Sequence, residues 1–335
     1  MKILVAGGAG YIGSTVCSAL LDAGHTPVIL DSLVNGRIEF TRGREFYKGD
    51  IADGALLGTI MAAHPDIECA IHLAALIVVP DSVANPYGYY TENVAKSLVF
   101  YNNLLANGIK KIVFSSSAAM YDDSPETDFI VTEESPLKPK SPYSRTKLMM
   151  EMILEDFNAA YGLNAITLRY FNIIGADPQM RSGLQNASPS HILGKLVSVA
   201  EGALDRFTVT GTDWPTRDGT GIRDYIHVWD LARAHVSAVE RFDAVIRDAG
   251  SGYVPINLGC NNGVTVREIV AAFENVYGQK IEQDTAPPRA GDVAGAYADT
   301  KRAAALLQWK PELTIEDGIR HALQWGKARR EMLGY

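Results

Sequence analysis

The first half of the chain alternates short apolar runs with longer stretches in which apolar residues recur at helical spacing. The apolar runs predict strands at 3–5, 28–30, 45–50, 69–73, 111–115 and 165–169. The stretches between them predict helices at 16–21, 53–63, 87–107 and 142–160, the last with Ser141 as N-cap and Pro142 at its first position. Such regular alternation predicts an α/β fold with a Rossmann-type, doubly wound parallel sheet.

The alternation weakens after residue 172. Helical runs there mix with loops rich in Gly, Pro and Asp, and they lie at 190–202, 229–242, 265–277 and 315–331. The proline-rich, polar stretch 122–142 predicts an exposed loop. We therefore expect a sheet domain at 1–172 and a smaller, mixed α/β domain at 173–335, with residues at about 224–260 as a candidate segment that crosses back to the first.

A glycine-rich turn separates the first predicted strand from the first predicted helix. Gly7, Gly10 and Gly13 give the spacing G-x-x-G-x-x-G, which permits a tight turn and lets backbone N–H groups approach a pyrophosphate. Asp31 ends the second predicted strand, where a carboxylate hydrogen-bonds the adenosine ribose and repels a 2′-phosphate. This pattern predicts a dinucleotide site and favours NAD over NADP. The alternative is an ordinary strand–turn–helix that binds no ligand.

Polar and small residues follow the other predicted strands. Asp50, Ala74-Ala75 and Ser115-Ser116-Ser117 come at or just after the ends of three of them. Ligands of doubly wound sheets bind beyond the carboxyl ends of the strands. These residues and Asp31 are therefore expected along one edge of the sheet.

A tyrosine and a lysine lie four residues apart on the helix predicted at 142–160. Tyr143 and Lys147 share one helix face, and a nearby ammonium favours the phenolate over the phenol. Lowering a phenol pKa of about 10 by three units needs about 4 kcal/mol, which Lys147 and an oxidised nicotinamide together could supply. Ser117 would hydrogen-bond the same substrate hydroxyl. The alternative is a surface Tyr–Lys pair without a function.

Composition narrows the function classes. The chain has 335 residues, 47% of them hydrophobic, and a formal net charge of −8, which argues against nucleic-acid or anionic-membrane binding. No apolar run is long enough to span a bilayer, the start of the chain leads directly into the first predicted strand, and the three cysteines are widely spaced. We expect a cytoplasmic protein. His72 is expected to be a satisfied core histidine, and the histidines show no metal-ligand spacing, so no metal is expected.

Several stretches resemble the extended short-chain dehydrogenase/reductase family, and within it the UDP-glucose 4-epimerases. The likeness covers nearly the whole chain. It is carried by 7–14, 114–118, 141–143 with Lys147, 168–172, 257–259, 289–292, and Asp218-Gly219-Thr220-Gly221 before Arg223-Asp224-Tyr225. It implies an NAD-dependent 4-epimerase of UDP-glucose and UDP-galactose that works through a 4-keto intermediate, with a UDP-sugar bound by the smaller domain and a homodimer formed through the helices at 87–107 and 143–160.

The resemblance also implies site residues. The catalytic residues would be Ser117, Tyr143 and Lys147. NAD contacts would come from Gly7, Gly10, Tyr11, Ile12, Gly13, Asp31, Ser32, Asn35, Asp50, Ile51, Leu73, Ala74, Ala75, Asn93, Ser115, Tyr143, Lys147, Tyr170 and Phe171. Substrate contacts would come from Ser117, Tyr143, Asn172, His191, Ile192, Arg223, Arg289, Asp292 and Ala296.

Three positions depart from the family pattern. Ile77 stands where a cofactor-contacting lysine is usual, and Asp122 replaces a glycine near the sugar. Ala296 replaces a bulky tyrosine, which leaves room for a 2-acetamido group and makes UDP-GlcNAc and UDP-GalNAc further candidate substrates.

Two rival functions stay open. One is another NAD-dependent nucleotide-sugar epimerase or dehydratase, although Ser117-Ala118-Ala119 lacks the carboxylates that a dehydratase needs. The other is a non-catalytic NAD sensor, a class that tends to lose the Ser, Tyr and Lys set.

Overall fold

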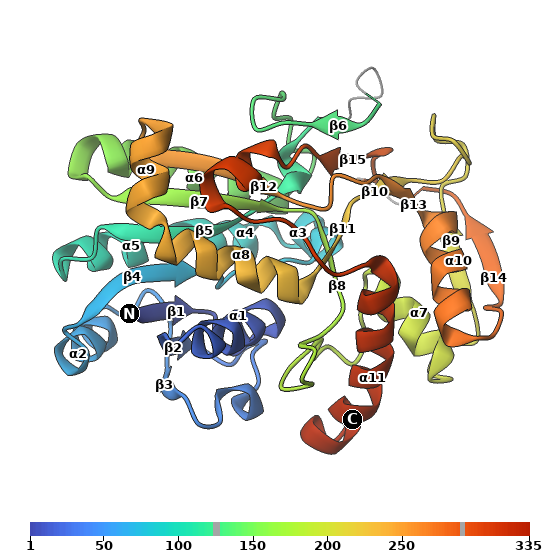
Figure 1. Ribbon diagram of the computed structural model, residues 1–335, viewed down its shortest axis with the longest axis horizontal. Helices are drawn as coiled ribbons and strands as arrows, with labels where there is room; N and C mark the ends of the chain where they lie inside the picture. Colours follow the sequence, from blue (N-terminus) through green and yellow to red (C-terminus); the bar gives the residue numbers. More distant parts are fainter. Residues whose placement is uncertain (123–127, 289–291) are drawn as a thin grey trace.

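The computed structural model describes residues 1–122, 128–288 and 292–335. Its central feature is a seven-stranded, all-parallel sheet (Figure 1). In spatial order the strands are β3 (Glu45–Lys48), β2 (Thr26–Asp31), β1 (Lys2–Ala6), β4 (Ile67–His72), β5 (Lys111–Ser117), β7 (Asn164–Tyr170) and β12 (Tyr253–Leu258). The order reverses between β1 and β4, which places the ligand crevice of a doubly wound fold beyond the ends of these two strands.

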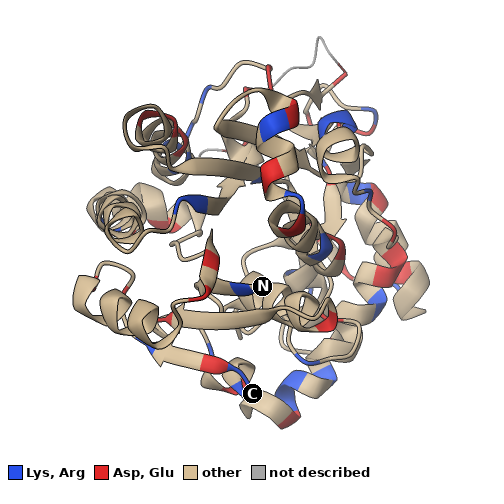
Figure 2. Cartoon of the chain, turned by 60° about the vertical axis from the view of Figure 1, so that its left-hand side comes forward, with Lys and Arg blue, Asp and Glu red and all other residues tan. Residues whose placement is uncertain are grey.

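Helices cover both faces of this sheet. One face carries α1 (Tyr11–Asp22), α8 (Val228–Glu240), α9 (Phe242–Ala249) and η5 (Ala303–Leu307). The other carries α2 (Gly54–Ala63), α5 (Lys96–Ala106) and α6 (Pro142–Tyr161). Alternate strand residues serve the two layers: Ile3 and Val5 of β1 pack on the first face, and Leu4 and Ala6 on the second. The strands buried on both faces are mostly uncharged in Figure 2.

A second packing unit lies beyond the sheet edge. It contains α7 (Ile192–Ala200), α10 (Val266–Tyr277) and α11 (Ile315–Leu333), whose apolar faces share one core. Its strands are short: β8 (Asn172–Ile174) pairs with β11 (Tyr225–His227), and β9 (Phe207–Thr210) with β14 (Gln283–Ala286). A four-stranded sheet has the order β13 (Val264–Thr265), β10 (Ile222–Arg223), β15 (Gly295–Ala298) and β6 (Ile130–Val131).

The predicted elements occur, with several differences. The helix expected at 87–107 is divided into α4 (Pro86–Tyr90), a π-helical turn, η2 (Thr91–Ala95), and α5, while α3 (Val79–Ala84) and the 3-10 turns η1 (Ile38–Thr41) and η3 (Ala118–Met120) were not predicted. The expected loop 122–142 contains β6, and its residues 123–127 lie outside the described residues. The strand β12, absent from the predicted six, returns to pair with β7.

The loops that hold the candidate site leave the sheet at one edge. Ser141 caps α6 with a capping box to Ser144, and Pro142 is the first helical residue, as predicted. This cap fixes where α6 begins and therefore places Tyr143 in its first turn. No helix in the described ranges is long and apolar enough to cross a membrane.

Candidate active site

The glycine loop makes an open, positively polarised end of α1. Gly7 has a φ of +86°, and a Cβ there would lie 2.6 Å from the backbone nitrogen of Ala74. A Cβ on Gly13 would lie 2.1 Å from the carbonyl oxygen of Gly7, whereas one on Gly10 would come no nearer than 3.6 Å to any described heavy atom. Gly10 is the N-cap of α1, and no described side chain caps it. Uncapped amides at a helix N-terminus fit a pyrophosphate.

Asp31 stands at the end of β2 and faces this loop. Its side chain is 8% exposed and accepts hydrogen bonds from the N–H groups of Ala9 at 2.9 Å and Leu33 at 2.8 Å. Burial raises the pKa of this carboxyl, and the two N–H groups act against that rise. The predicted partners Ser32 and Asn35 follow in an exposed loop. The structure thus brings an acidic side chain to the loop, as a dinucleotide site requires.

The ends of β3 and β4 continue the same edge. Asp50 accepts hydrogen bonds from Lys96 at 2.6 Å and from the N–H of Ala52 at 2.9 Å, and the salt bridge with Lys96 lowers its pKa against the effect of burial. Ile51 is buried, and Leu73, Ala74 and Ala75 are half-buried. The sequence analysis did not single out Lys96, although its helical position one turn past Glu92, with which it pairs, was a usable signal.

Asn93 makes protein contacts that fix this edge. Its amide accepts the N–H of Leu76 at 2.8 Å and donates to the carbonyl of Leu76 at 2.9 Å and to Thr146 at 3.1 Å. It therefore ties the loop after β4 to α6. A direct contact between Asn93 and NAD stays a prediction.

Ser117, Tyr143 and Lys147 come together at the end of β5. A hydrogen bond joins the side chains of Ser117 and Tyr143. The ammonium nitrogen of Lys147 lies 6.0 Å from the centre of the Tyr143 ring and donates to the carbonyl of Ser115 at 2.7 Å. Lys147 is 3% exposed. The four-residue spacing on α6 therefore does place the phenol and the ammonium on one face, beside a serine from the neighbouring strand.

The protein alone does not make Tyr143 a base. Burial raises the pKa of its phenol, and the hydrogen bond with Ser117 acts in the opposite direction. Burial also lowers the pKa of Lys147 to about 7, while the carboxylate of Glu151 raises it. The lower phenol pKa that we expected would therefore have to come from the Lys147 charge together with a cationic cofactor.

Tyr170 and Phe171 close the site from β7. Tyr170 pairs in register with Ser117 and is hydrogen-bonded to Ser115 and His235. Phe171 is 7% exposed and stacks against Tyr121, with ring centres 6.5 Å apart. His72, beneath this layer, bonds Tyr101 and Ser97 inside a ring of aromatic side chains, which confirms the expectation of a core histidine.

Four of the predicted substrate residues lie on or beside β8, β10 and β15. Asn172 begins β8, and its N–H donates to the carbonyl of Asp224 at 2.9 Å. The guanidinium of Arg223 donates to the carbonyls of Ile222, Ala294 and Val293, so it lies against the segment that contains Asp292. Ala296 is opposite Arg223 in the register of β15 and β10. Arg289 lies outside the described residues.

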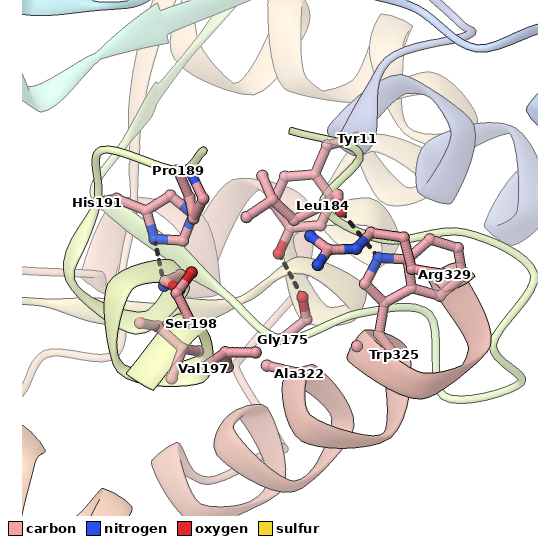
Figure 3. A pocket seen from close by; sticks show the side chains of 13 residues that line it. Tyr11, Gly175, Leu184, Pro189, His191, Val197, Ser198, Ala322, Trp325 and Arg329 are labelled. Carbon is pink, nitrogen blue, oxygen red and sulfur yellow. Dashed lines mark hydrogen bonds between the residues drawn. The ribbon is translucent and has the colours of Figure 1, made fainter. Parts of the chain in front are cut away.

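A cavity connects the glycine loop to the second unit (Figure 3). It is lined by Tyr11, by His191 at the N-cap of α7, and by Trp325 and Arg329 of α11. Tyr11 donates to the carbonyl of Gly175 at 2.6 Å, and His191 accepts the N–H of Gly194 at 3.2 Å through Nδ1. Its Nε2 is buried without a partner in the described structure, and burial lowers the imidazole pKa to about 4. His191 is therefore a neutral imidazole with a free donor, next to Ile192 in α7.

No group of three or more His, Cys, Asp or Glu side chains in the described residues is arranged to hold a metal ion. The titratable groups at the sheet edge are instead the carboxyls of Asp31 and Asp50, the phenol of Tyr143, and the amino groups of Lys96 and Lys147. Such groups can transfer protons, and we expect Tyr143 to be the one that exchanges a proton with a substrate.

Comparison with known proteins matches the NAD dependent epimerase/dehydratase family over residues 3–251. A UDP-glucose 4-epimerase from Bacillus subtilis is 41% identical over 335 aligned residues, which cover 97% of this chain and 96% of that protein. Two crystal structures are similar over nearly the full length. The UDP-glucose 4-epimerase of Stenotrophomonas maltophila, with NAD and formylated UDP-arabinopyranose, has a TM-score of 0.92 at 36% identity and 99% coverage of both chains. That of Bifidobacterium longum, with NAD+ and UDP, has a TM-score of 0.90 at 35% identity and 98% coverage of both.

Proposed function

The chain belongs to the NAD dependent epimerase/dehydratase family, and from this premise we propose that it is an NAD-dependent UDP-glucose 4-epimerase. It would interconvert UDP-glucose and UDP-galactose by inverting the configuration at C4. The observation that carries the proposal is the grouping of Ser117, Tyr143 and Lys147 at the edge of the sheet that also presents the glycine loop. Full-length similarity to UDP-glucose 4-epimerases supports it.

The chain's own residues account for the proton steps. Tyr143, as the phenolate, takes the proton of the sugar 4-hydroxyl, and Ser117 hydrogen-bonds the same oxygen. Lys147 stabilises the phenolate electrostatically. NAD, when bound, supplies the hydride acceptor and donor at C4. After the 4-keto sugar has turned its other face, Tyr143 returns the proton, so its ionisation state is restored in each cycle.

The cofactor would be held by groups of different kinds. The uncapped first turn of α1, entered by Gly10, suits the pyrophosphate, and Asp31 suits the adenosine ribose hydroxyls. Asp50 and Ile51, which follow β3, would contact the adenine end of the cofactor. Ile77, which is 62% exposed, adds no charge there.

On the substrate side, Arg223, Arg289 and Asn172 would bind the diphosphate, with Asp292 on the ribose. A guanidinium suits phosphate because its fork bonds two oxygens at once. His191 adds a neutral Nε2 donor at the start of α7. This second unit, residues 173–335 apart from the β11–β12 region, is the proposed UDP-sugar domain, and 1–172 the NAD domain.

The direct test is turnover without added cofactor. Purified protein incubated with UDP-galactose should yield UDP-glucose of unchanged mass, and denaturation should release NAD(H). Tyr143→Phe should lower kcat by about 10²–10⁴, because general base catalysis contributes about that much. Tyr161→Phe is the matched control, since Tyr161 ends the same helix and is 59% exposed. A product lighter by one water would instead indicate a dehydratase, and a protein without bound NAD(H) would refute the proposal.

Ala296 supports a wider substrate range that includes UDP-GlcNAc and UDP-GalNAc. Its methyl group is half-buried beside Ala118 and Phe171, in the small cluster next to Ser117. Ala296→Tyr would fill that space and should lower kcat/KM for UDP-GalNAc far more than for UDP-galactose. Tyr297→Phe, a conservative substitution at the next position of the same strand, controls for disturbance of β15. Negligible turnover of UDP-GalNAc by the unaltered protein would end this part of the proposal.

We further propose a cytoplasmic homodimer. Exposed apolar side chains follow α5 and α6: Leu98 and Val99 are each 42% exposed, Met149 40% and Met152 57%. The three cysteines, all among the described residues, are free thiols, which suits a reducing compartment. Light scattering of Leu98→Glu/Met152→Glu should give a monomer, and a dimer of unchanged size would contradict this interface.

A further inference from the structure

A buried ion pair lies one helical turn beyond Lys147. Glu151 follows Lys147 by four residues on α6, so Tyr143, Lys147 and Glu151 lie on one face in successive turns. Arg169 of β7 donates from Nε to Glu151 Oε1 at 3.1 Å and from Nη2 to Oε2 at 2.6 Å. The two side chains are 2% and 4% exposed. Tyr253 adds a third hydrogen bond to Glu151 at 2.7 Å. The carboxylate is thus fully held in one position.

The remaining nitrogen of Arg169 reaches the chain that follows Ser117. Nη1 donates to the hydroxyl of Tyr121 at 2.8 Å and to the carbonyl of Glu133 at 3.1 Å. Tyr121 in turn donates to Asn257 at 2.6 Å. Arg169 also pairs in the sheet with Ser116, directly before Ser117. One guanidinium therefore fixes α6 against the segment that presents Ser117.

Lys147 has an unusual electrostatic setting. In the described part of the chain no carboxylate lies within salt-bridge distance of it. The titratable groups that face it are Tyr143 and Glu151 from α6 and His72 from β4, and His72 is neutral because burial lowers its pKa to about 3. From β5 it meets the Ser115 carbonyl and the Phe114 ring. Glu151 is therefore the anion that favours the charged form of Lys147, against the cost of burial.

We propose, on the basis of the proposed function, that Glu151 and Arg169 are positioning residues of this active site. The Glu151 carboxylate, fixed by Arg169, keeps Lys147 as an ammonium ion beside Tyr143, and Arg169 aligns the Ser117 segment with the same helix. Neither residue touches the substrate. They act through Lys147 and Ser117, so their loss changes the ionisation of the site as well as its geometry.

The consequence is a specific change in the pH dependence of kcat. Activity needs Tyr143 deprotonated and Lys147 protonated, which gives a bell-shaped profile whose two limbs belong to the coupled pair. Without the Glu151 charge, Lys147 loses its proton at lower pH, so the alkaline limb moves down. On the acid limb Lys147 remains protonated, so that limb does not move up. The bell-shaped profile should therefore narrow from its alkaline side.

The experiment compares Glu151→Gln with Glu155→Gln in the NAD-loaded protein. Glu155 is an exposed carboxylate one turn further along α6, so its loss removes the same charge from the same helix without touching the pair. We expect Glu151→Gln to move the alkaline limb down by about one pH unit, a tenfold change in the ionisation constant. KM for UDP-galactose should stay within twofold, and Glu155→Gln should keep the unaltered profile. A uniform loss of kcat at every pH in Glu151→Gln would overturn the proposal.

Two further variants separate charge from packing. Glu151→Asp keeps the charge but shortens the side chain, and should retain the original alkaline limb even where kcat falls. Glu151→Met/Arg169→Met removes both charges and fills the space, and it should narrow the bell if Glu151→Gln alone does not fold. An Asp variant shifted as far as the Gln variant would show that packing, not charge, is responsible.

A measurement without turnover keeps the inference separate from the proposed function. The near-ultraviolet difference absorbance between NAD-loaded protein and its Tyr143→Phe variant reports ionisation of Tyr143 directly. Introducing Glu151→Gln into both should move the alkaline step of this titration, where the phenolate loses its neighbouring ammonium, to lower pH. If the unaltered protein turns over no UDP-sugar, the proposed function fails, yet this titration still decides the role of Glu151. An unmoved titration would refute that role.

Discussion

At the scale of single residues, Gly10 and Gly13 differ in what a methyl group would meet. A Cβ at Gly13 would collide with the backbone of Gly7 at 2.1 Å and of Gly8 at 2.8 Å, whereas one at Gly10 meets its nearest described atom at 3.6 Å, an ordinary contact. The packing of the folded protein therefore requires glycine at position 13, because a side chain there would collide with the backbone. The fold alone does not require glycine at position 10. The open space beside Gly10 is where we expect a pyrophosphate to bind.

Replacing each glycine with alanine should separate folding from cofactor binding. Gly13→Ala should lower the melting temperature of NAD-free protein, because backbone atoms must shift to admit the methyl group. Gly10→Ala should leave that temperature nearly unchanged and raise the Kd for NAD. Thermal melts and equilibrium binding of NAD check both. Equal losses of stability in the two variants would contradict the assignment.

The sequence predicted these site residues unevenly. Ser117, Tyr143 and Lys147 were accessible because helical spacing and a strand end are local properties. The Glu151–Arg169 pair joins a helix to a strand 18 residues away, and neither residue type is expected in a core unless it is paired. Such a partnership cannot be recognised before the fold places α6 on β7.

At the scale of elements, α6 depends on how it begins. Ser141 accepts the N–H of Ser144, and Ser144 in turn accepts the N–H of Ser141. Tyr143 lies inside this capped turn, so the cap orients the phenol as well as fixing where the helix begins. The sequence predicted this boundary because its signals, a cap residue followed by proline, are adjacent in the chain.

Ser141→Ala should lower the free energy of unfolding by about 1 kcal/mol, the usual effect of losing an N-cap. It should also lower kcat, because the first turn carries Tyr143. Thr314→Ala removes the equivalent capping box of α11, far along the chain from Tyr143. That variant should lose similar stability in urea titrations while keeping kcat. Loss of kcat in both variants alike would indicate a general effect of stability.

Several elements of the second half were beyond local reasoning. β10 and β13 have two residues each, and they are strands because β15 and one another supply partners. β12 carries a proline and follows α9, a helix that was not predicted, so its place beside β7 depends on tertiary packing. Long, periodic elements were predictable, whereas short strands defined by distant partners were not.

At the scale of the whole molecule, the buried histidines determine how the free energy of unfolding changes as the pH falls. Burial lowers the pKa of His72 and His227 to about 3 and of His191 and His235 to about 4. A histidine whose folded pKa lies below its unfolded value near 6.5 stabilises the protein fully above that value, and the stabilisation declines as pH falls toward the folded pKa. Asp224, whose pKa burial raises to about 6, opposes this trend over the same range.

The free energy of unfolding should therefore fall between pH 6.5 and 4. Each such histidine contributes up to about 1.4 kcal/mol per pH unit, and Asp224 offsets about one of the four. Urea titrations at several pH values measure the slope. His235→Gln should reduce that slope by the equivalent of about one proton. Asp156→Asn, at an exposed position that caps no helix, should leave the slope unchanged. A stability independent of pH over this interval would contradict the argument.

The π-helical turn Thr91–Ala95 interrupts what would otherwise be one continuous α-helix. An extra residue in one turn rotates everything after it by roughly a quarter revolution relative to an uninterrupted α-helix. Asn93 thereby points inward to Leu76 and Thr146, while Leu98 and Val99 of α5 point outward. Deleting a single residue here would leave a more regular helix, but the side chains before and after the deletion would no longer face their present surroundings together. The π-helical turn thus lets one helical segment direct Asn93 toward the loop after β4 and α6 while it presents Leu98 and Val99 at the surface.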